Sequence, residues 1–229
     1  MSAAGIAVIV PVRDGATYLG AALASALSQE PGPVEVVVVD DGSSDGSGEL
    51  AARLAGVRVV SVPRLGPGAA RNAGVRESRA PLLAFLDADD LFPPGRLERM
   101  ARALGVPPDF DGVLGRIRTF LTPDREPELR GRYACPPEPL AGRHPGALLV
   151  TRAAFLRTAG FDETLRVGEG VDWFHRAEAA GVRFSRVDDV VLERRIHGGN
   201  LTLQSAASRI DYVRAAHAAI LRKGGASRP

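Results

Sequence analysis

The stretch Pro81-Leu82-Leu83-Ala84-Phe85-Leu86-Asp87-Ala88-Asp89-Asp90 decides how the rest of the chain is interpreted. Its apolar first part, residues 81–86, predicts a short buried strand. Three carboxylates follow at once, and because like charges repel and are costly to hold beside an apolar core, a cation is expected next to them. Oxygen ligands with no cysteine nearby suit Mg²⁺ or Mn²⁺. The alternative is an acidic turn in which Asp90 is a solvated cap of a helix that begins near Pro93.

Apolar runs and helical patterns alternate before and through this stretch. Continuous β-branched and apolar runs predict buried strands, and apolar residues at helical spacing separate them. This alternation predicts βαβ units, and therefore an α/β fold with a Rossmann-like, mostly parallel sheet and helices on both faces. The expected strands are 6–10, 34–39, 57–62 and 81–86, and the expected helices are 18–27, 49–54, 69–79 and 93–104.

The regular alternation ends after residue 104. Residues 121–145 are rich in Pro, Arg and Gly, and a long stretch of this kind inside a compact domain is usually functional or mobile. No linker divides the chain, so one domain over residues 1–229 is expected. The remaining expected elements are strands at 109–120, 146–151, 182–187 and 190–196, and helices at 153–159, 169–180 and 205–222.

Composition indicates an ordinary globular protein. The chain has 229 residues, 45% hydrophobic and 24% charged, with a net charge of only +2. We therefore expect no nucleic-acid partner, and interpret the arginines of residues 116–132 as a solvated face. The single cysteine, Cys135, excludes an internal disulfide and favours a reducing, cytoplasmic location. No apolar run is long enough to span a bilayer. Peripheral membrane contact stays open, because basic residues flank the apolar stripe of helix 205–222.

Polar residues also follow two other expected strands. Asp40-Asp41 needs hydrogen-bond donors, which a nucleobase or ribose could supply, whereas Asp45 is interpreted as a helix cap. Residues 66–74 open a helix with small residues and include Arg71, whose planar fork suits a base or phosphate. The fingerprints of dinucleotide-binding and P-loop proteins are absent from the sequence.

Taken together, these motifs resemble those of family 2 glycosyltransferases with the GT-A fold, over nearly the whole chain. The resemblance implies metal-dependent, inverting transfer of a sugar from a nucleotide-diphosphate donor, expected to be UDP-linked, to an acceptor hydroxyl or thiol. It also implies a nucleotide-binding half at 1–104 and an acceptor-binding half at 105–204, followed by the C-terminal helix. The matching segments are 8–15, 38–43, 70–74, 85–90, 146–149 and 160–163.

The resemblance assigns roles to individual residues. Asp41 corresponds to a uracil-contacting acid, and Arg71 to a base or phosphate contact. Asp87 and Asp89 form the Asp-x-Asp pair that touches ribose and holds Mn²⁺ or Mg²⁺, and His197 resembles a late histidine that reaches back to the metal or the diphosphate. The expected nucleotide-sugar contacts are Pro11, Val12, Arg13, Asp14, Asp41, Arg71, Asp87 and Ala88, and the expected metal ligands are Asp89, Asp87 and His197.

The sequence departs from the family at the general base. The family has Glu-Asp at the start of the late helix, whereas this chain has Gly170 in place of the Asp. Glu169 and Asp172 lie three residues apart on one helix face, so either could accept the proton, and Glu169 is favoured because it is in the first turn. Both acids could instead only favour the helix N-terminus electrostatically. Trp173 could stack on the acceptor or belong to the core.

The sequence leaves the acceptor and two alternative functions open. A small molecule, a peptide or a glycan could accept the sugar, and residues 121–145 are the expected acceptor lid. A sugar-1-phosphate nucleotidyltransferase shares the general fold but should have a Gly-rich loop after the first strand, which Pro11-Val12-Arg13-Asp14-Gly15 is not. A non-catalytic sugar-nucleotide-binding protein is the other alternative, and Gly170 favours it.

Overall fold

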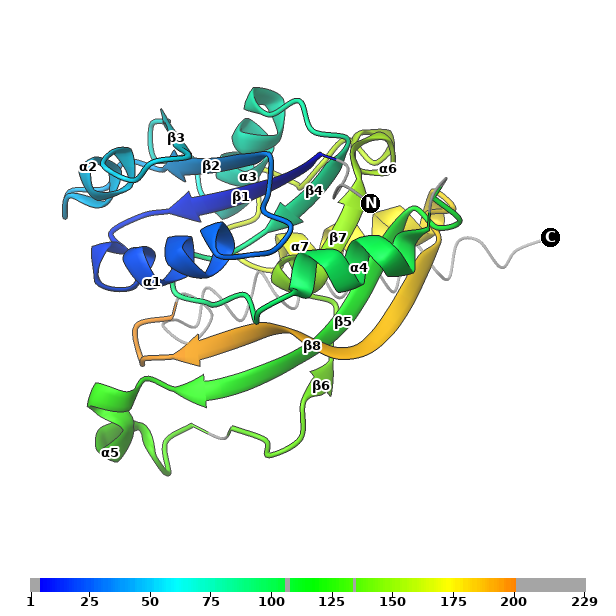
Figure 1. Ribbon diagram of the computed structural model, residues 1–229. Coiled ribbons are helices and arrows are strands. Elements are labelled where there is room, and N and C mark those ends of the chain that lie inside the picture. The colour runs from blue at the N-terminus through cyan, green and yellow to red at the C-terminus, as the bar shows by residue number, and fades with distance from the viewer. Residues whose placement is uncertain (1–4, 106–107, 134, 201–229) are drawn as a thin grey trace.

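The computed structural model describes residues 5–105, 108–133 and 135–200 (Figure 1). The closing helix expected at 205–222 lies outside these residues. The strands are β1 (Ile6–Val12), β2 (Glu35–Asp40), β3 (Val57–Ser61), β4 (Leu82–Phe85), β5 (Gly112–Leu121), β6 (Leu140–Ala141), β7 (Leu148–Thr151) and β8 (Phe184–Ile196). The helices are α1 (Ala16–Leu27), α2 (Ser47–Ala52), α3 (Pro67–Glu77), α4 (Arg96–Leu104), α5 (Glu126–Leu129), α6 (Arg152–Arg157) and α7 (Glu169–Ala179), with 3₁₀ turns η1 (Pro123–Arg125) and η2 (Pro145–Ala147).

The eight strands of the described residues form one sheet, whose pairing is parallel in one half and mixed in the other. Its order is β3-β2-β1-β4-β7-β5-β6, with β8 paired to β5. The four strands from the first part of the chain are parallel, as the βαβ alternation predicts. Beyond β4 the strands mix directions, because β7 is antiparallel to both β4 and β5, and β8 is parallel to β5. The α/β prediction is therefore confirmed, with the parallel pairs concentrated in the first half.

Both faces of the sheet are buried, as expected for strands without polar alternation. Along β1, Ile6, Val8 and Val10 face one core, in which α1 and α4 pack. Ala7 and Ile9 face the opposite core, in which α3, α6 and α7 pack. Figure 1 shows these two helical layers on either side of the sheet. The layers leave the carboxyl ends of β1, β2 and β4 at one edge, which is where ligands bind in sheets of this kind.

Helix α3 approaches the sheet closely because of its small residues. A side chain on Gly74 would place its Cβ 2.4 Å from Cγ2 of Ile9, so only glycine fits there. The small residues of segment 66–74 thus permit helix-to-sheet packing at this position. The same helix brings the buried Arg71 beside the end of β4.

The second half differs from expectation in one strand. The two strands expected at 182–187 and 190–196 are a single strand, β8. Its pairing with β5 shifts register near Leu114 and Arg116, and a bulge of this kind admits extra residues without ending the strand. Exposed Asp188 and Asp189 lie at this irregularity, and they caused the apparent break in the apolar pattern.

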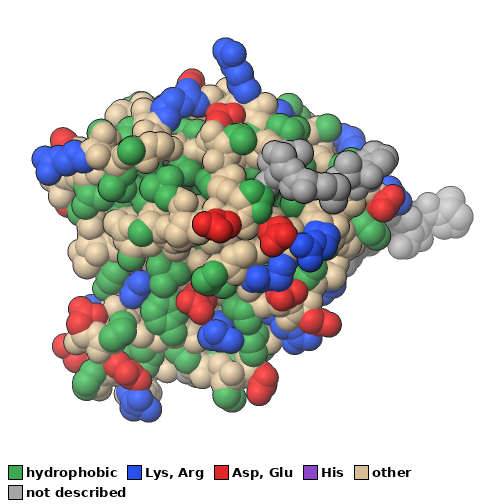
Figure 2. Space-filling model, in the orientation of Figure 1, with side chains coloured by type: hydrophobic (Ala, Val, Ile, Leu, Met, Phe, Trp, Pro, Cys, Tyr) green, Lys and Arg blue, Asp and Glu red, His purple; other side chains and the backbone are tan. Residues whose placement is uncertain are grey.

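The arginines of residues 116–132 lie on a face where acidic side chains accompany them. Figure 2 shows positive and negative side chains interspersed on the face it presents. Arg116 is 2.8 Å from Asp188, and Arg118 is 3.3 Å from Glu193. Arg125 and Arg130 pair with acids of their own segment, Glu128 and Glu126. This pattern supports the interpretation as a solvated face. Among the described residues, no helix is both long enough and apolar enough to span a bilayer.

Candidate active site

A cleft of about 850 Å³ opens at the carboxyl ends of β1, β2 and β4. Its opposite wall is formed by the start of α7, the segment before η2, and the residues that end and follow β8. Every residue expected to contact the nucleotide sugar or the metal lines this cleft, and so does Glu169, whereas Asp172 does not. The lining residues used below are Pro11, Val12, Arg13, Asp14, Tyr18, Asp41, Arg71, Asp87, Ala88, Asp89, Asp90, His144, Pro145, Glu169, Gly170, Arg194, His197 and Asn200.

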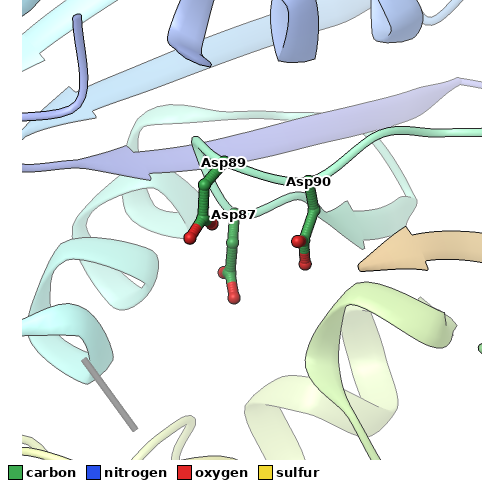
Figure 3. A group of neighbouring side chains, drawn as sticks. All are labelled: Asp87, Asp89 and Asp90. Atoms are coloured by element: carbon green, nitrogen blue, oxygen red, sulfur yellow. The ribbon is translucent and has the colours of Figure 1, made fainter. Parts of the chain in front are cut away.

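Three carboxylates gather where β4 ends. Figure 3 shows Asp87, Asp89 and Asp90 projecting to the same side of the loop. Each offers one oxygen, and these oxygens lie within 4.8 Å of one another. The side chains of Asp87 and Asp89 are 26% and 29% exposed, so both are open to the cleft. Among the described residues, this is the one group of acidic, histidine or cysteine side chains close enough to share a metal ion.

Asp89 is held from the far end of the described chain. His197 places Nε2 3.0 Å from Oδ2 of Asp89, and Asn200 donates from Nδ2 to the same oxygen at 3.0 Å. Asn200 also accepts the backbone N–H of His197, and the ring of Tyr18 packs against the imidazole at 4.7 Å. His197 therefore lies beside the carboxylate cluster, as the resemblance implies.

Asp90 is not the solvated cap considered as an alternative. It is 2% exposed, and its Oδ1 accepts the backbone N–H of Arg195 at 2.9 Å. Burial raises the pKa of Asp90 well above the usual carboxyl range, and the nearby charges of Asp89 and Asp87 raise it further. The third carboxylate thus ties the end of β4 to β8, while Asp87 and Asp89 face the cleft.

An alternating chain of charges connects this cluster to α7. Arg71, 4% exposed, donates from Nη2 to Oδ1 of Asp87 and from Nη1 to Oε1 of Glu169, each at 2.5 Å. Coulombic attraction and hydrogen bonding outweigh desolvation and raise the pKa of Arg71, so it stays charged. Arg71 was expected to contact the nucleotide. Both of its terminal nitrogens are thus bound to carboxylates of the protein. Arg71 fixes the orientation of Asp87 and Glu169 on adjacent walls of the cleft.

The residues after β1 and β2 form the other end of the cleft. Asp41 accepts the backbone N–H groups of Leu65 and Gly66, at 2.5 and 2.9 Å, so the start of α3 is tied to the end of β2. Asp14 has a positive φ of 49° and accepts from both the backbone and the hydroxyl of Ser44. A non-glycine residue in that conformation is a strained feature often found at binding sites.

Asp45 lies beside these residues and caps helices, as expected. Its Oδ2 accepts the N–H of Ala16 at the start of α1, and its Oδ1 accepts the N–H of Ser47 at the start of α2. These bonds satisfy amide groups that have no partner within their own helices. One carboxylate therefore links the starts of α1 and α2.

The two candidate bases on α7 face different surroundings. Glu169 is 7% exposed and lies on the cleft wall. Asp172 is 2% exposed and accepts from Nε of Arg176 at 2.7 Å, while the same arginine binds the carbonyls of Thr158 and Gly160. This geometry favours Glu169 as the base and gives Asp172 a structural position. Trp173 belongs to the core: it is fully buried, and its Nε1 donates to the hydroxyl of Thr158.

Gly170, where the family has an aspartate, has no room for a side chain. A Cβ there would lie 2.8 Å from Cδ and 2.9 Å from Cγ of Pro145. Pro145 follows the irregular stretch and begins η2. Pro145 therefore occupies the space that a side chain at position 170 would need.

Two residues that line the cleft were not expected from the sequence. Asn200 holds Asp89, and His144 lines the cleft with Nε2 3.9 Å from Oδ2 of Asp87. The sequence places them 111 and 57 residues from their partners, in segments without a regular pattern. The sequence signals for a site role were weak. His144 directly precedes Pro145-Gly146, and Asn200 follows His197 after two glycines.

Solved structures with similar folds define the class of protein. The structure of Staphylococcus aureus TarS residues 1–349 in complex with UDP-GlcNAc matches with a TM-score of 0.74, at 20% identity, over 95% of this chain and 66% of that chain. The structure of the same TarS residues in complex with UDP matches with a TM-score of 0.70 over 95% of this chain and 65% of that one, also at 20% identity. The fold is therefore the GT-A fold.

Sequence comparison then identifies the family. The profile of Glycosyl transferase family 2 matches residues 7–164, more than half of the chain, so the chain belongs to this family of glycosyltransferases. Succinoglycan biosynthesis protein ExoU of Rhizobium meliloti is 33% identical over 86% of this chain. ExoO of the same organism is 44% identical over 40% of this chain. The chain spans 64% of the length of ExoU and 27% of that of ExoO. The family assignment disfavours the nucleotidyltransferase alternative.

Proposed function

We propose that the protein is a metal-dependent, inverting glycosyltransferase that moves a sugar from a UDP-linked donor to an acceptor hydroxyl or thiol. The observation that carries this proposal is the pair Asp87 and Asp89, exposed in the cleft where β4 ends and held by groups from distant parts of the chain. Family membership supports glycosyl transfer, and UDP complexes of the structurally similar TarS support a uridine nucleotide.

The carboxylate cluster has the donor chemistry that a hard divalent ion requires. Three carboxylate oxygens within 4.8 Å of one another form an oxygen-rich group, and neighbouring His197 adds an imidazole nitrogen. Asp87, Asp89 and His197 are the residues that would hold Mn²⁺ or Mg²⁺. Such an ion supplies charge neutralisation for a leaving diphosphate.

The described side chains divide the remaining work of an in-line displacement. The acceptor oxygen or sulfur attacks the anomeric carbon, the bond from that carbon to the phosphate oxygen breaks, and the nucleoside diphosphate leaves. Glu169 takes the acceptor proton, a role that typically contributes about 10²–10⁴-fold in rate. Arg71 orients Glu169 toward the same space as Asp87 through its two 2.5 Å bonds. Attack from the side opposite the leaving group inverts the anomeric centre.

At the nucleotide end, the first strand and Asp41 supply the expected contacts. Pro11, Val12, Arg13 and Asp14 line one side of the cleft and Ala88 lies beside the metal-binding pair. Each Asp41 oxygen already accepts one backbone N–H, and a carboxylate oxygen has a second lone pair for a uracil N–H. Of residues 121–145, the stretch that we propose as the acceptor lid, Arg143, His144 and Pro145 line the cleft, and we propose that the acceptor enters on their side.

A sugar-nucleotide panel tests this function. We expect release of UDP from at least one UDP-sugar with Mn²⁺ or Mg²⁺, its loss on adding a chelator, and its recovery on returning the ion. The anomeric configuration of the product, measured by NMR, tests inversion. Binding of UDP in calorimetry without turnover of any donor or acceptor would instead support the non-catalytic alternative that Gly170 favours. Turnover that persists in the chelator would contradict the metal requirement.

A further inference from the structure

His144 and Asp87 face each other across a gap that neither side chain fills. Nε2 of His144 lies 3.9 Å from Oδ2 of Asp87, which is too far for a direct hydrogen bond. One hydroxyl oxygen can lie about 2.8 Å from each atom, a usual hydroxyl hydrogen-bond length, if it sits to the side of the line that joins them. The two side chains are 24% and 26% exposed, so the gap is accessible from the cleft.

The hydrogen bonds of His144 determine which of its nitrogens can donate. Its Nδ1 accepts the backbone N–H of Gly146 at 3.0 Å, so in the neutral ring the proton is on Nε2. With Nδ1 occupied as an acceptor, the imidazole presents its Nε2–H as a donor to the gap.

Neighbouring contacts hold both sides of the gap in place. Oδ1 of Asp87 is bound by Arg71, which leaves Oδ2 on the His144 side. The next residue after His144, Pro145, lies against α7, where a Cβ added at Gly170 would be 2.8 Å from its Cδ. A fixed acceptor and a fixed donor around one position form a ready binding site for a hydroxyl group, which can accept and donate at once.

We infer that His144 and Asp87 together bind one hydroxyl group of the sugar that is transferred, which makes His144 a specificity-determining residue. This inference rests on the proposed function. Asp87 is, with Asp89, a proposed metal ligand, and it is joined through Arg71 to Glu169, the proposed base. A sugar whose diphosphate is held at Asp87 and Asp89 and whose acceptor is deprotonated by Glu169 would lie beside this gap.

Two variants of His144 separate its donor from its structural hydrogen bond. His144→Asn keeps an oxygen that can accept the N–H of Gly146, and asparagine is a good residue at such a cap, but nothing reaches the Nε2 position. His144→Gln instead carries an amide N–H to about the place of Nε2. His144→Asn therefore keeps the bond from Gly146 and loses the donor, whereas His144→Gln keeps the donor and loses that bond, so an effect confined to His144→Asn is due to the donor.

The experiment is calorimetric titration in Mg²⁺, first with UDP, dTDP and GDP to find the nucleotide that binds, and then with its glucose and N-acetylglucosamine derivatives. We expect His144→Asn to weaken binding of the better sugar nucleotide roughly 5- to 20-fold and that of the free nucleotide less than about twofold, because one neutral hydrogen bond is lost. His144→Gln should retain most of the wild-type affinity.

Three outcomes would overturn the inference. Equal weakening of the nucleotide and its sugar derivative would assign the pair to the nucleotide, and unchanged binding of both would show that the gap holds no sugar group. Failure of wild-type protein to bind any of the three nucleotides would contradict the proposed function itself. As a positive check, one monodeoxy analogue of the donor should bind wild type more weakly than the parent sugar nucleotide, and His144→Asn should no longer distinguish the two.

Discussion

The carboxylates after β4 and those at the start of α7 differ in how they are used, although within each set the acids are at most three residues apart in the sequence. Asp87 and Asp89, separated by one residue in a loop, both open onto the cleft. Glu169 and Asp172, on one helix, are divided between the cleft and an internal ion pair with Arg176. Asp90, next to Asp89, is likewise buried and accepts the backbone N–H of Arg195, so in both sets the neighbouring elements decide which acid faces the cleft.

Neutralising Asp89 should produce the largest effect. Asp89→Asn keeps the size of the side chain but removes the charge that would hold the metal, and metal assistance contributes several kcal/mol to such reactions. We expect UDP release to fall roughly 10³-fold at fixed Mn²⁺, since about 1.4 kcal/mol corresponds to a factor of ten. Steady-state kinetics measures this. Asp188→Asn, which alters an exposed acid paired with Arg116, is the control and should be unchanged.

Substituting the two acids of α7 should affect different quantities, kcat for Glu169 and the free energy of unfolding for Asp172. Glu169→Gln should lower kcat about 10²-fold or more, because it removes the proposed base. Asp172→Asn should leave kcat within about threefold but lower the free energy of unfolding by about 2–3 kcal/mol, since it breaks a mostly buried ion pair. Kinetics and denaturant unfolding distinguish these results. A large loss of kcat in stable Asp172→Asn protein would reassign the base.

The contact between Gly170 and Pro145 can be tested by adding and then removing atoms. Gly170→Ala places a methyl group 2.8 Å from Pro145, and overpacking of this kind costs about 1–3 kcal/mol. Adding Pro145→Ala should recover much of that loss in thermal unfolding. Gly20→Ala is the matched control, because nothing lies within 4 Å of that position on α1, and it should be neutral or slightly stabilising. Equal effects at the two glycines would contradict the packing argument.

Asp90→Asn should give the smallest effect, which is a change in how the free energy of unfolding depends on pH. The folded chain holds its proton more tightly than the unfolded chain, because burial and then Asp89 and Asp87 raise the pKa of Asp90. Its contribution to stability is therefore complete below the ordinary carboxyl pKa and is lost as pH rises through the folded-state pKa. With a chelator present, the free energy of unfolding of Asp90→Asn should decline less steeply over that pH range than that of the wild type. Identical pH profiles for the variant and wild type would refute this.

The parallel half of the fold was predictable, because its determinants are local. Uninterrupted apolar strands, helical spacing and acids at strand ends are each visible within about ten residues, and they place Asp41, Asp87 and Asp89 at one edge of the sheet. The position of His197 beside Asp89 followed only from the family resemblance.

The second half depends on contacts between distant segments. The continuity of β8 across Asp188 and Asp189 reflects its pairing with β5, and the gap beside His144 reflects the position of a carboxylate from another strand end. Nothing within residues 121–145 indicates that Pro145 would pack on Gly170. These features require the three-dimensional arrangement, because no local pattern encodes which elements meet.

The tie between Asp89 and the residues after β8 has a consequence for the order in which the protein matures. A ribosome releases the parallel strands first, and early segments begin to fold during synthesis. The contacts of Asp89 with His197 and Asn200 form later, because these residues are synthesised 108 and 111 residues after it. A nascent chain that stops short of them has the acidic loop but not the two side chains that bind Asp89, so the carboxylate cluster gains these contacts only after β8 has joined the sheet.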